Sequence, residues 1–216
     1  MKVSSFFGLS VLSLALALTG CEKDETDNIS RVKSYAAITL RGDEYYVINV
    51  GETFNDPGVT TVLAGAPIEP TITGTVNTST PGLYRITYSA ANTEGDEVST
   101  VRSVIVTDPA VNNLDQSGNF QRPTFALSSV TKVGNKGLYR LDNFGFTNAP
   151  NLFTAYFVQT TPTSIVVPAQ TIAGLGFTTF TSVSSTFAAG LLTGITYAIN
   201  APAVFGTNVR TANRVP

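Results

Sequence analysis

The sequence predicts an all-β protein built from two successive antiparallel β-domains, the second of them a sandwich or a barrel. After the first 20 residues, short apolar runs alternate with turn-forming residues, and no convincing helical period appears. Thr, Val, Gly, Asn, Pro, Tyr and Phe dominate these runs, as they do in β-sandwiches and β-barrels. A break rich in Pro and Asn at residues 108–113 separates the two patterned regions.

Residues 1–20 have the features of a signal peptide. Lys2 supplies the positive charge, and the apolar stretch at 6–18 is shorter than the roughly 20 residues that a membrane-spanning helix needs. The sequence Leu-Thr-Gly-Cys at 18–21 is similar to the bacterial lipobox. This resemblance implies cleavage before Cys21 and attachment of lipid to its thiol, which would bind the protein to a membrane through several acyl chains. The alternative is an ordinary signal peptide that ends near a cysteine.

Residues 21–34 are predicted to form a flexible tether, because they are highly charged and show no hydrophobic period. Its Lys-Asp-Glu sequence at 23–25 resembles the surface-export signal of Bacteroidetes lipoproteins. That resemblance implies a lipid-anchored location on the outer membrane, facing the cell exterior. The alternative is a plain solvated linker.

The first domain covers residues 35–108, with strands expected at 37–40, 45–50, 84–90 and 100–106. In the third strand, Tyr84, Ile86, Tyr88 and Ala90 alternate with polar residues, which indicates a half-buried antiparallel strand. Pro-Gly pairs at 57–58 and 81–82 predict tight turns, because proline presets φ and glycine accepts a positive φ.

Two segments of this domain resemble the signatures of a bacterial immunoglobulin-like (Ig-like), cadherin-like module. They are Val-Gly-Glu-Thr-Phe-Asn-Asp-Pro-Gly-Val at 50–59 and the run at 75–88 that ends in Leu-Tyr-Arg-Ile-Thr-Tyr. The resemblance implies an Ig-like β-sandwich of about seven strands with Tyr84 as a tyrosine corner. It implies a spacer, adhesive or ligand-presenting role and no catalytic residue. Asn77 stands where the family more often has Asp.

Four acidic residues of the first domain raise the question of calcium, which cadherin-like modules bind through clustered carboxylates. They are Glu52, Asp56, Asp96 and Asp108. Because no dense Asp-x-Asp-x-Asp run occurs, we favour turn capping and solvated acids, and we predict no metal site and no cofactor.

The second domain covers residues 114–216. Strands are expected at 130–133 and 138–141 around a Gly-rich turn, then in the segment 164–170, where a proline stops the strand, and at 174–182 and 194–200. The segment 137–146 resembles the C-terminal domain of uncharacterised Bacteroidetes lipoproteins that carry it after an Ig-like module.

Composition excludes several classes of function. The 216 residues include no histidine, which removes Ser-His-Asp and Cys-His catalysis, and a single cysteine, which removes internal disulfides. Residues 21–112 carry a net charge of −7 and residues 113–216 a net charge of +4, without the basic and aromatic repeats typical of nucleic-acid binding. Asp115 and Asp142 are the only acids of the second domain, which disfavours glycoside hydrolysis there. We therefore predict that the protein is not an enzyme.

The function that these observations favour is a lipid-anchored cell-surface accessory protein whose C-terminal domain binds a glycan or another ligand. The predicted site uses rings to stack on sugars and amides to bind hydroxyls: Tyr139, Phe144, Phe146, Tyr156, Asn143, Asn148 and Asn151. One alternative is that these rings fill the core, as Phe usually does in a β-domain. Another is a structural or adhesive envelope protein that contacts other surface proteins and has no small-ligand site.

Overall fold

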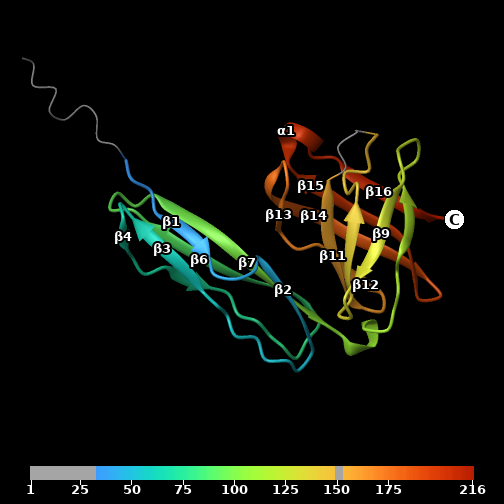
Figure 1. The fold of residues 1–216 in the computed structure, drawn as a ribbon, viewed down its shortest axis with the longest axis horizontal. Coiled ribbons are helices and arrows are strands. Elements are labelled where there is room, and N and C mark those ends of the chain that lie inside the picture. The colour runs from blue at the N-terminus through green and yellow to red at the C-terminus, as the bar shows by residue number, and fades with distance from the viewer. Residues whose placement is uncertain (1–32, 149–152) are drawn as a thin grey trace, which may run out of the picture. The chain divides into compact units, whose positions relative to one another are not determined.

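The computed structural model describes residues 33–148 and 153–216, and it confirms the all-β prediction (Figure 1). The predicted signal peptide, most of the tether and Cys21 lie outside the described residues, as does Asn151. Within the part that is described, no helix is long and apolar enough to cross a membrane.

The first region of the structure contains seven strands in two sheets. They are β1 (Ala37–Leu40), β2 (Tyr45–Asn49), β3 (Val59–Leu63), β4 (Ala66–Pro67), β5 (Thr71–Thr73), β6 (Gly82–Ala91) and β7 (Glu97–Thr107). One sheet has the order β1-β3-β4 and the other β2-β7-β6-β5. All neighbours are antiparallel except β2 and β7, which run parallel. This is the predicted sandwich, with β3, β4 and β5 added to the strands that the sequence indicated.

Alternation along β6 builds the core of this region, as predicted. Ile86, Tyr88 and Ala90 are buried, while the intervening residues are more exposed. With Ile48, Val104 and Val106 from β2 and β7, Ile86 and Tyr88 form a buried cluster between the sheets. The tyrosine corner is also confirmed, since the Tyr84 hydroxyl donates to the backbone oxygen of Thr80 at 2.9 Å.

A short 3₁₀ helix, η1 (Pro109–Val111), occupies the predicted break between the regions. Asp108 caps it, and its carboxylate accepts a hydrogen bond from the Ala110 amide at 2.8 Å. Pro109 follows at the first helical position, where a missing amide proton costs nothing.

The second region contains nine strands in one sheet. They are β8 (Gly118–Gln121), β9 (Ser128–Val133), β10 (Leu138–Asp142), β11 (Thr154–Thr161), β12 (Ser164–Val166), β13 (Gln170–Ile172), β14 (Gly176–Ala188), β15 (Leu191–Asn200) and β16 (Val209–Val215). The order is β12-β11-β10-β9-β8-β16-β15-β14-β13, antiparallel throughout. A short helix, α1 (Pro202–Phe205), connects β15 and β16.

This nine-stranded sheet curls into a half-barrel, so that β12 lies against β14. Gln170 joins the two ends of the curl with its side-chain amide. Its Oε1 accepts from the Tyr156 amide at 2.8 Å and its Nε2 donates to the Tyr156 oxygen at 2.9 Å. The side chain of this buried glutamine thus bonds the backbone of β11 as a neighbouring strand would, and its own polar atoms have hydrogen-bond partners.

The concave side of the half-barrel holds a second core, which is rich in aromatic rings. Phe144 packs against Phe153, Phe180 and Phe205 with ring centroids 5.4–6.3 Å apart. Residues 143–209, which supply most of these rings, contain no charged side chain. The positive charge of this domain therefore comes from outside that stretch.

Candidate ligand-binding cleft

Three of the aromatic residues predicted to stack on a ligand are core residues instead. Tyr139, Phe144 and Phe146 are fully buried. Tyr139 stacks on Phe157, with centroids 5.2 Å apart, and Phe146 stacks on Tyr197 at 5.6 Å. These three rings contribute to stability and present no surface to a ligand, which corrects the prediction that placed them in an exposed site.

The predicted amides are also not gathered around an open site. Asn143 is 2% exposed and bonds to Thr147 within its own turn, with Nδ2 donating to the Thr147 oxygen at 2.9 Å. Asn148 is exposed, and its Nδ2 donates to the Thr124 oxygen at 3.3 Å. Asn151 lies outside the described residues.

Tyr156 is the predicted ring that remains partly exposed. It lies on β11, and its ring packs against that of Tyr45 on β2, with centroids 6.2 Å apart. Tyr45 was expected only to be part of a strand. Its ring contact with Tyr156 joins segments that are distant in the sequence, and the alternation of residues along a strand does not indicate such contacts.

A cleft of about 520 Å³ borders Tyr45. The described residues that line it are Asp43, Glu44, Tyr45, Val47 and Leu138. Strand alternation explains the β2 part of the lining, because Tyr45 and Val47 share a face while Ile48 points into the sandwich core. The cleft therefore combines a phenol ring, two aliphatic side chains and two carboxylates.

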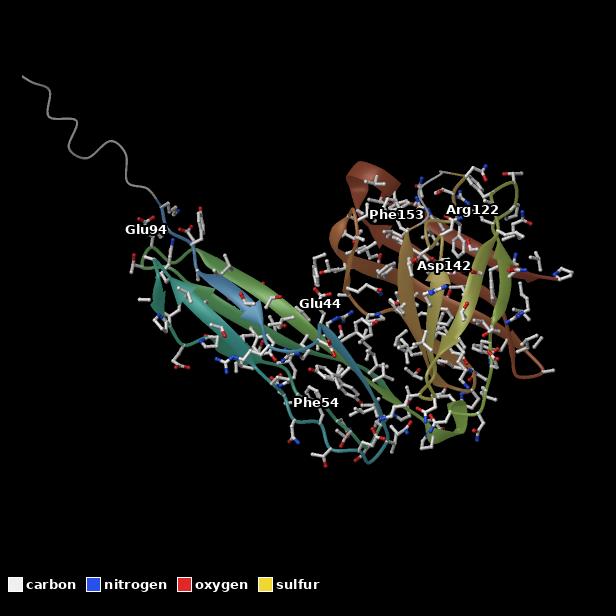
Figure 2. All side chains as sticks on the ribbon, viewed as in Figure 1. Glu44, Phe54, Glu94, Arg122, Asp142 and Phe153 are labelled. Carbon is white, nitrogen blue, oxygen red and sulfur yellow. The ribbon has the colours of Figure 1, made fainter. Side chains whose placement is uncertain are left out.

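Glu44, which is labelled in Figure 2, is hydrogen-bonded to Thr171. Its carboxylate accepts from the Thr171 amide at 2.6 Å and from the Thr171 hydroxyl. Asp43 has an exposed side chain, and its backbone amide donates to the Tyr46 hydroxyl at 3.1 Å. Asp43 is thus the lining carboxylate that faces solvent and has acceptor capacity to offer.

Burial, the nearby Tyr156 and the charges of Asp43 and Glu44 raise the pKa of Tyr45 to about 12. Its hydroxyl is therefore a neutral donor throughout the physiological range. A ring with a neutral hydroxyl beside an exposed carboxylate suits a polyhydroxylated ligand, whose C–H face can pack on the ring while its hydroxyls donate to the carboxylate.

The four acids considered for calcium have local partners. Asp56 binds Arg102 and Tyr88. Asp108 caps η1, and Asp96 accepts from Asn92. Glu52 pairs with Lys136, and its pKa is lowered chiefly by that contact and by the Asn49 amide. No three Asp, Glu, Cys or His residues come together as a metal-ligand group in residues 33–148 and 153–216.

Comparison with known proteins identifies the first domain. Residues 38–106 match the family model described as a bacterial surface protein, Ig-like domain. The predicted Ig-like module is therefore confirmed for this segment. No curated protein matches the chain.

Two solved structures are distantly similar. One is the lipoprotein BT2262 from Bacteroides thetaiotaomicron, with 18% identity and a TM-score of 0.36 over 83% of this chain and 100% of that chain. The other contains the M60 catalytic domain and the CBM51-1 and CBM51-2 domains of ZmpB from Clostridium perfringens. It has 14% identity and a TM-score of 0.31 over 86% of this chain and 24% of that chain. Neither similarity is close enough to support an inference about function.

Proposed function

We propose that this protein is a lipid-anchored accessory protein of the bacterial cell surface, and that it binds a glycan in the cleft beside Tyr45. The observation that carries the binding proposal is the Tyr45–Tyr156 ring pair next to the exposed carboxylate of Asp43. The bacterial surface Ig-like segment supports the location, and the Leu-Thr-Gly-Cys sequence ending at Cys21 supports the anchor.

Binding is favoured over catalysis by the arrangement of the two lining carboxylates. Glycoside hydrolysis needs two carboxyl groups that both reach the scissile bond. Glu44 is held by the amide and hydroxyl of Thr171, which leaves Asp43 alone to act on a ligand. We therefore propose a binding protein without enzymatic activity. We also propose that it binds neither nucleic acid nor a cofactor.

The binding proposal is tested with residues 22–216 by affinity electrophoresis in gels that contain neutral polysaccharides, followed by calorimetry on any ligand found. Replacing Tyr45 by Ala is expected to weaken binding about tenfold, because a stacked ring is lost. Tyr45→Phe keeps the ring and should bind better than Tyr45→Ala. Asp43→Asn should also weaken binding, since a charged acceptor becomes a neutral amide.

Matched controls lie away from the cleft. Tyr35→Ala removes an aromatic side chain that is 55% exposed ahead of β1, and Glu97→Gln neutralises an exposed acid on β7. Both should bind like the unaltered protein. Retardation that is equal in all variants, or no retardation on any polysaccharide, would contradict a glycan site in this cleft.

The anchor is tested separately. Protein purified from its native cell should carry a lipid mass on Cys21, and Cys21→Ser should abolish it and release the protein from the membrane fraction. Accessibility to externally added antibody in intact cells tests the outward orientation. Protein with an unmodified Cys21 would contradict the proposed lipid anchor. It would not affect the proposal of a glycan site.

A protein-contact role is the second candidate, and a groove in the Ig-like domain favours it. This groove has a volume of about 340 Å³, and its apolar lining includes Pro67, Ile68, Pro70 and Ile72. It lies where the edge strands β4 and β5 are joined, and Ile72 is 55% exposed. Ile72→Asp should reduce co-purification with an envelope protein if this groove is used.

A further inference from the structure

Arg210 on β16 is a nearly buried cation without a carboxylate partner among the described residues. The side chain is 6% exposed. Its two terminal nitrogens donate to backbone oxygens, to Asn208 at 2.9 Å and to Phe205. Its Nε is buried and has no hydrogen-bond partner. A buried guanidinium with an unused donor and no counter-charge is costly, because burial removes its hydration.

The acids of this domain are committed to other partners. Asp142 accepts hydrogen bonds from Arg140, Ser129 and Thr154. Asp115 accepts from the Ser117 amide at 2.8 Å. Since residues 143–209 carry no charge, the stretch of chain before Arg210 has no carboxylate to offer.

Strand register brings a second cation to the same face. The last pair of β8 and β16 is Gln121 with Asn213, and continuing this register past the end of β8 puts Arg122 opposite Ala212. Arg122 and Arg210 are then diagonal neighbours on one face, a separation that long side chains span. Arg210 shares a face of β16 with the fully buried Ala212, and the half-buried Arg122 follows two residues after the fully buried Phe120 of β8.

Arg122 does not use its charge within the described structure either. Its guanidinium lies 4.4 Å from the centroid of the Phe125 ring, a contact that positions the group but leaves its donors available (Figure 2 labels Arg122). Burial lowers the pKa of Arg210, and the nearby positive charge of Arg122 lowers it further. Two like charges held together in this way are stabilised by an anion between them.

We propose that Arg122 and Arg210 form a binding site for an oxyanion: a carboxylate, sulfate or phosphate group. Arg122 supplies planar donors that can bind such a group bidentately, and Arg210 supplies the fixed positive charge beneath it. This site is separate from the cleft beside Tyr45 and takes a different class of ligand, because the acids Asp43 and Glu44 that line the cleft would repel an anion and these two arginines attract one.

The test uses nuclear magnetic resonance on residues 22–216 labelled with ¹⁵N, observing the Nε–Hε signals of the arginines. Sodium sulfate, sodium phosphate and sodium glucuronate are titrated in turn, each against sodium chloride at equal ionic strength. The signals of Arg122 and Arg210 should shift saturably with at least one oxyanion, and the three arms identify which group is preferred.

Arg122→Gln should weaken that binding about tenfold, since a charged bidentate partner is lost. Arg122→Lys should weaken it less. Arg140→Gln is the matched control, because it removes a surface arginine of the same domain that pairs with Asp142. Shifts that grow linearly with salt, that match those in chloride, or that survive Arg122→Gln unchanged would overturn the proposal.

Discussion

Arg102 on β7 and Asp56 in the Asp-Pro-Gly turn form a salt bridge that ties the last strand of the Ig-like domain to its signature loop. Arg102 is fully buried, and it also donates to the Tyr88 hydroxyl at 2.8 Å and to the backbone oxygens of Arg41 and Gly58. The signature aspartate therefore serves as the counter-ion of a buried guanidinium that holds three chain segments together.

Asp56→Ala should destabilise the protein, because it leaves the charge of Arg102 buried without its anion. Breaking a fully buried pair costs about 3–5 kcal/mol, and we expect about 2 kcal/mol here because the Asp56 side chain retains 26% exposure. Urea unfolding followed by circular dichroism measures the change. Glu97→Gln, at an exposed acid of β7, is the control, and equal stability of the two variants would contradict this role.

Acid should destabilise the protein through the same carboxylate. Partial burial by itself raises the pKa of Asp56, but hydrogen bonds from Tyr88 and the Gly58 amide and the charge of Arg102 outweigh it, so the pKa lies below 3.8. A lowered folded-state pKa adds stability above the unfolded value, and this stability is lost as the pH falls through 3.8 toward the folded pKa.

Unfolding free energies measured from pH 6 to pH 2 test this dependence. The unaltered protein should lose stability below about pH 4, and Asp56→Asn should lose less over the same interval, since one of the responsible groups is absent. Curves of equal slope for the two proteins would show that Asp56 is not among the groups that drive acid unfolding.

Gly145 should tolerate no larger residue. A Cβ at this position would overlap the ring of Phe205, whose Cζ would lie 3.0 Å away. Gly145→Ala should therefore cost about 1–3 kcal/mol through overpacking of the aromatic core. Gly82→Ala is a matched control, because its Cβ would meet nothing closer than 3.8 Å. The melting temperatures of the two variants decide the matter, and equal values would contradict the packing argument.

Tyr45 should titrate late. The folded protein keeps this phenol neutral up to its pKa of about 12, whereas the phenol ionises near pH 10 in the unfolded chain. Because the unfolded chain releases its proton first, the free energy of unfolding falls as the pH rises from about 10 to 12. Absorbance at the phenolate band, compared between the unaltered protein and Tyr45→Phe, isolates this group. A difference spectrum that appears near pH 10 would show that burial and the charges of Asp43 and Glu44 do not keep the Tyr45 phenol neutral.

Local alternation was sufficient to predict the half-buried strand that became β6, whereas the Ig-like fold followed from the resemblance of the segments 50–59 and 75–88 to known signatures. Along β6 each buried side chain follows a polar one, so the faces of the strand can be assigned from a single sequence. The Tyr84 corner depends on residues close in the chain, and local signals indicate it well. Gly58 has the positive φ expected of it, but the turn predicted at 81–82 is wrong, because Gly82 begins β6 without a positive φ and the turn lies at 78–79. The short strands β4 and β5 were missed because two or three residues carry no measurable period.

The half-barrel and the cleft depend on contacts that local patterns do not encode. The sequence around Phe144 and Phe146 does not indicate whether these rings face solvent or the core. They are buried because they pack against Phe205 and Tyr197, which lie more than 50 residues away in the chain. The strand β13 is completed by the Gln170 amide, whose pairing with Tyr156 is a tertiary contact. Tyr45 and Tyr156 likewise come together only in the folded chain.

The uncharged stretch between Asp142 and Arg210 has a consequence for proteolysis. A protease that cleaves after lysine or arginine finds no bond to cut between Arg140 and Arg210, and Arg210 is itself 6% exposed. Strands β11 to β15 therefore stay on one continuous segment after every exposed tryptic site in the protein has been cleaved. Mass spectrometry after limited digestion should recover this segment uncut.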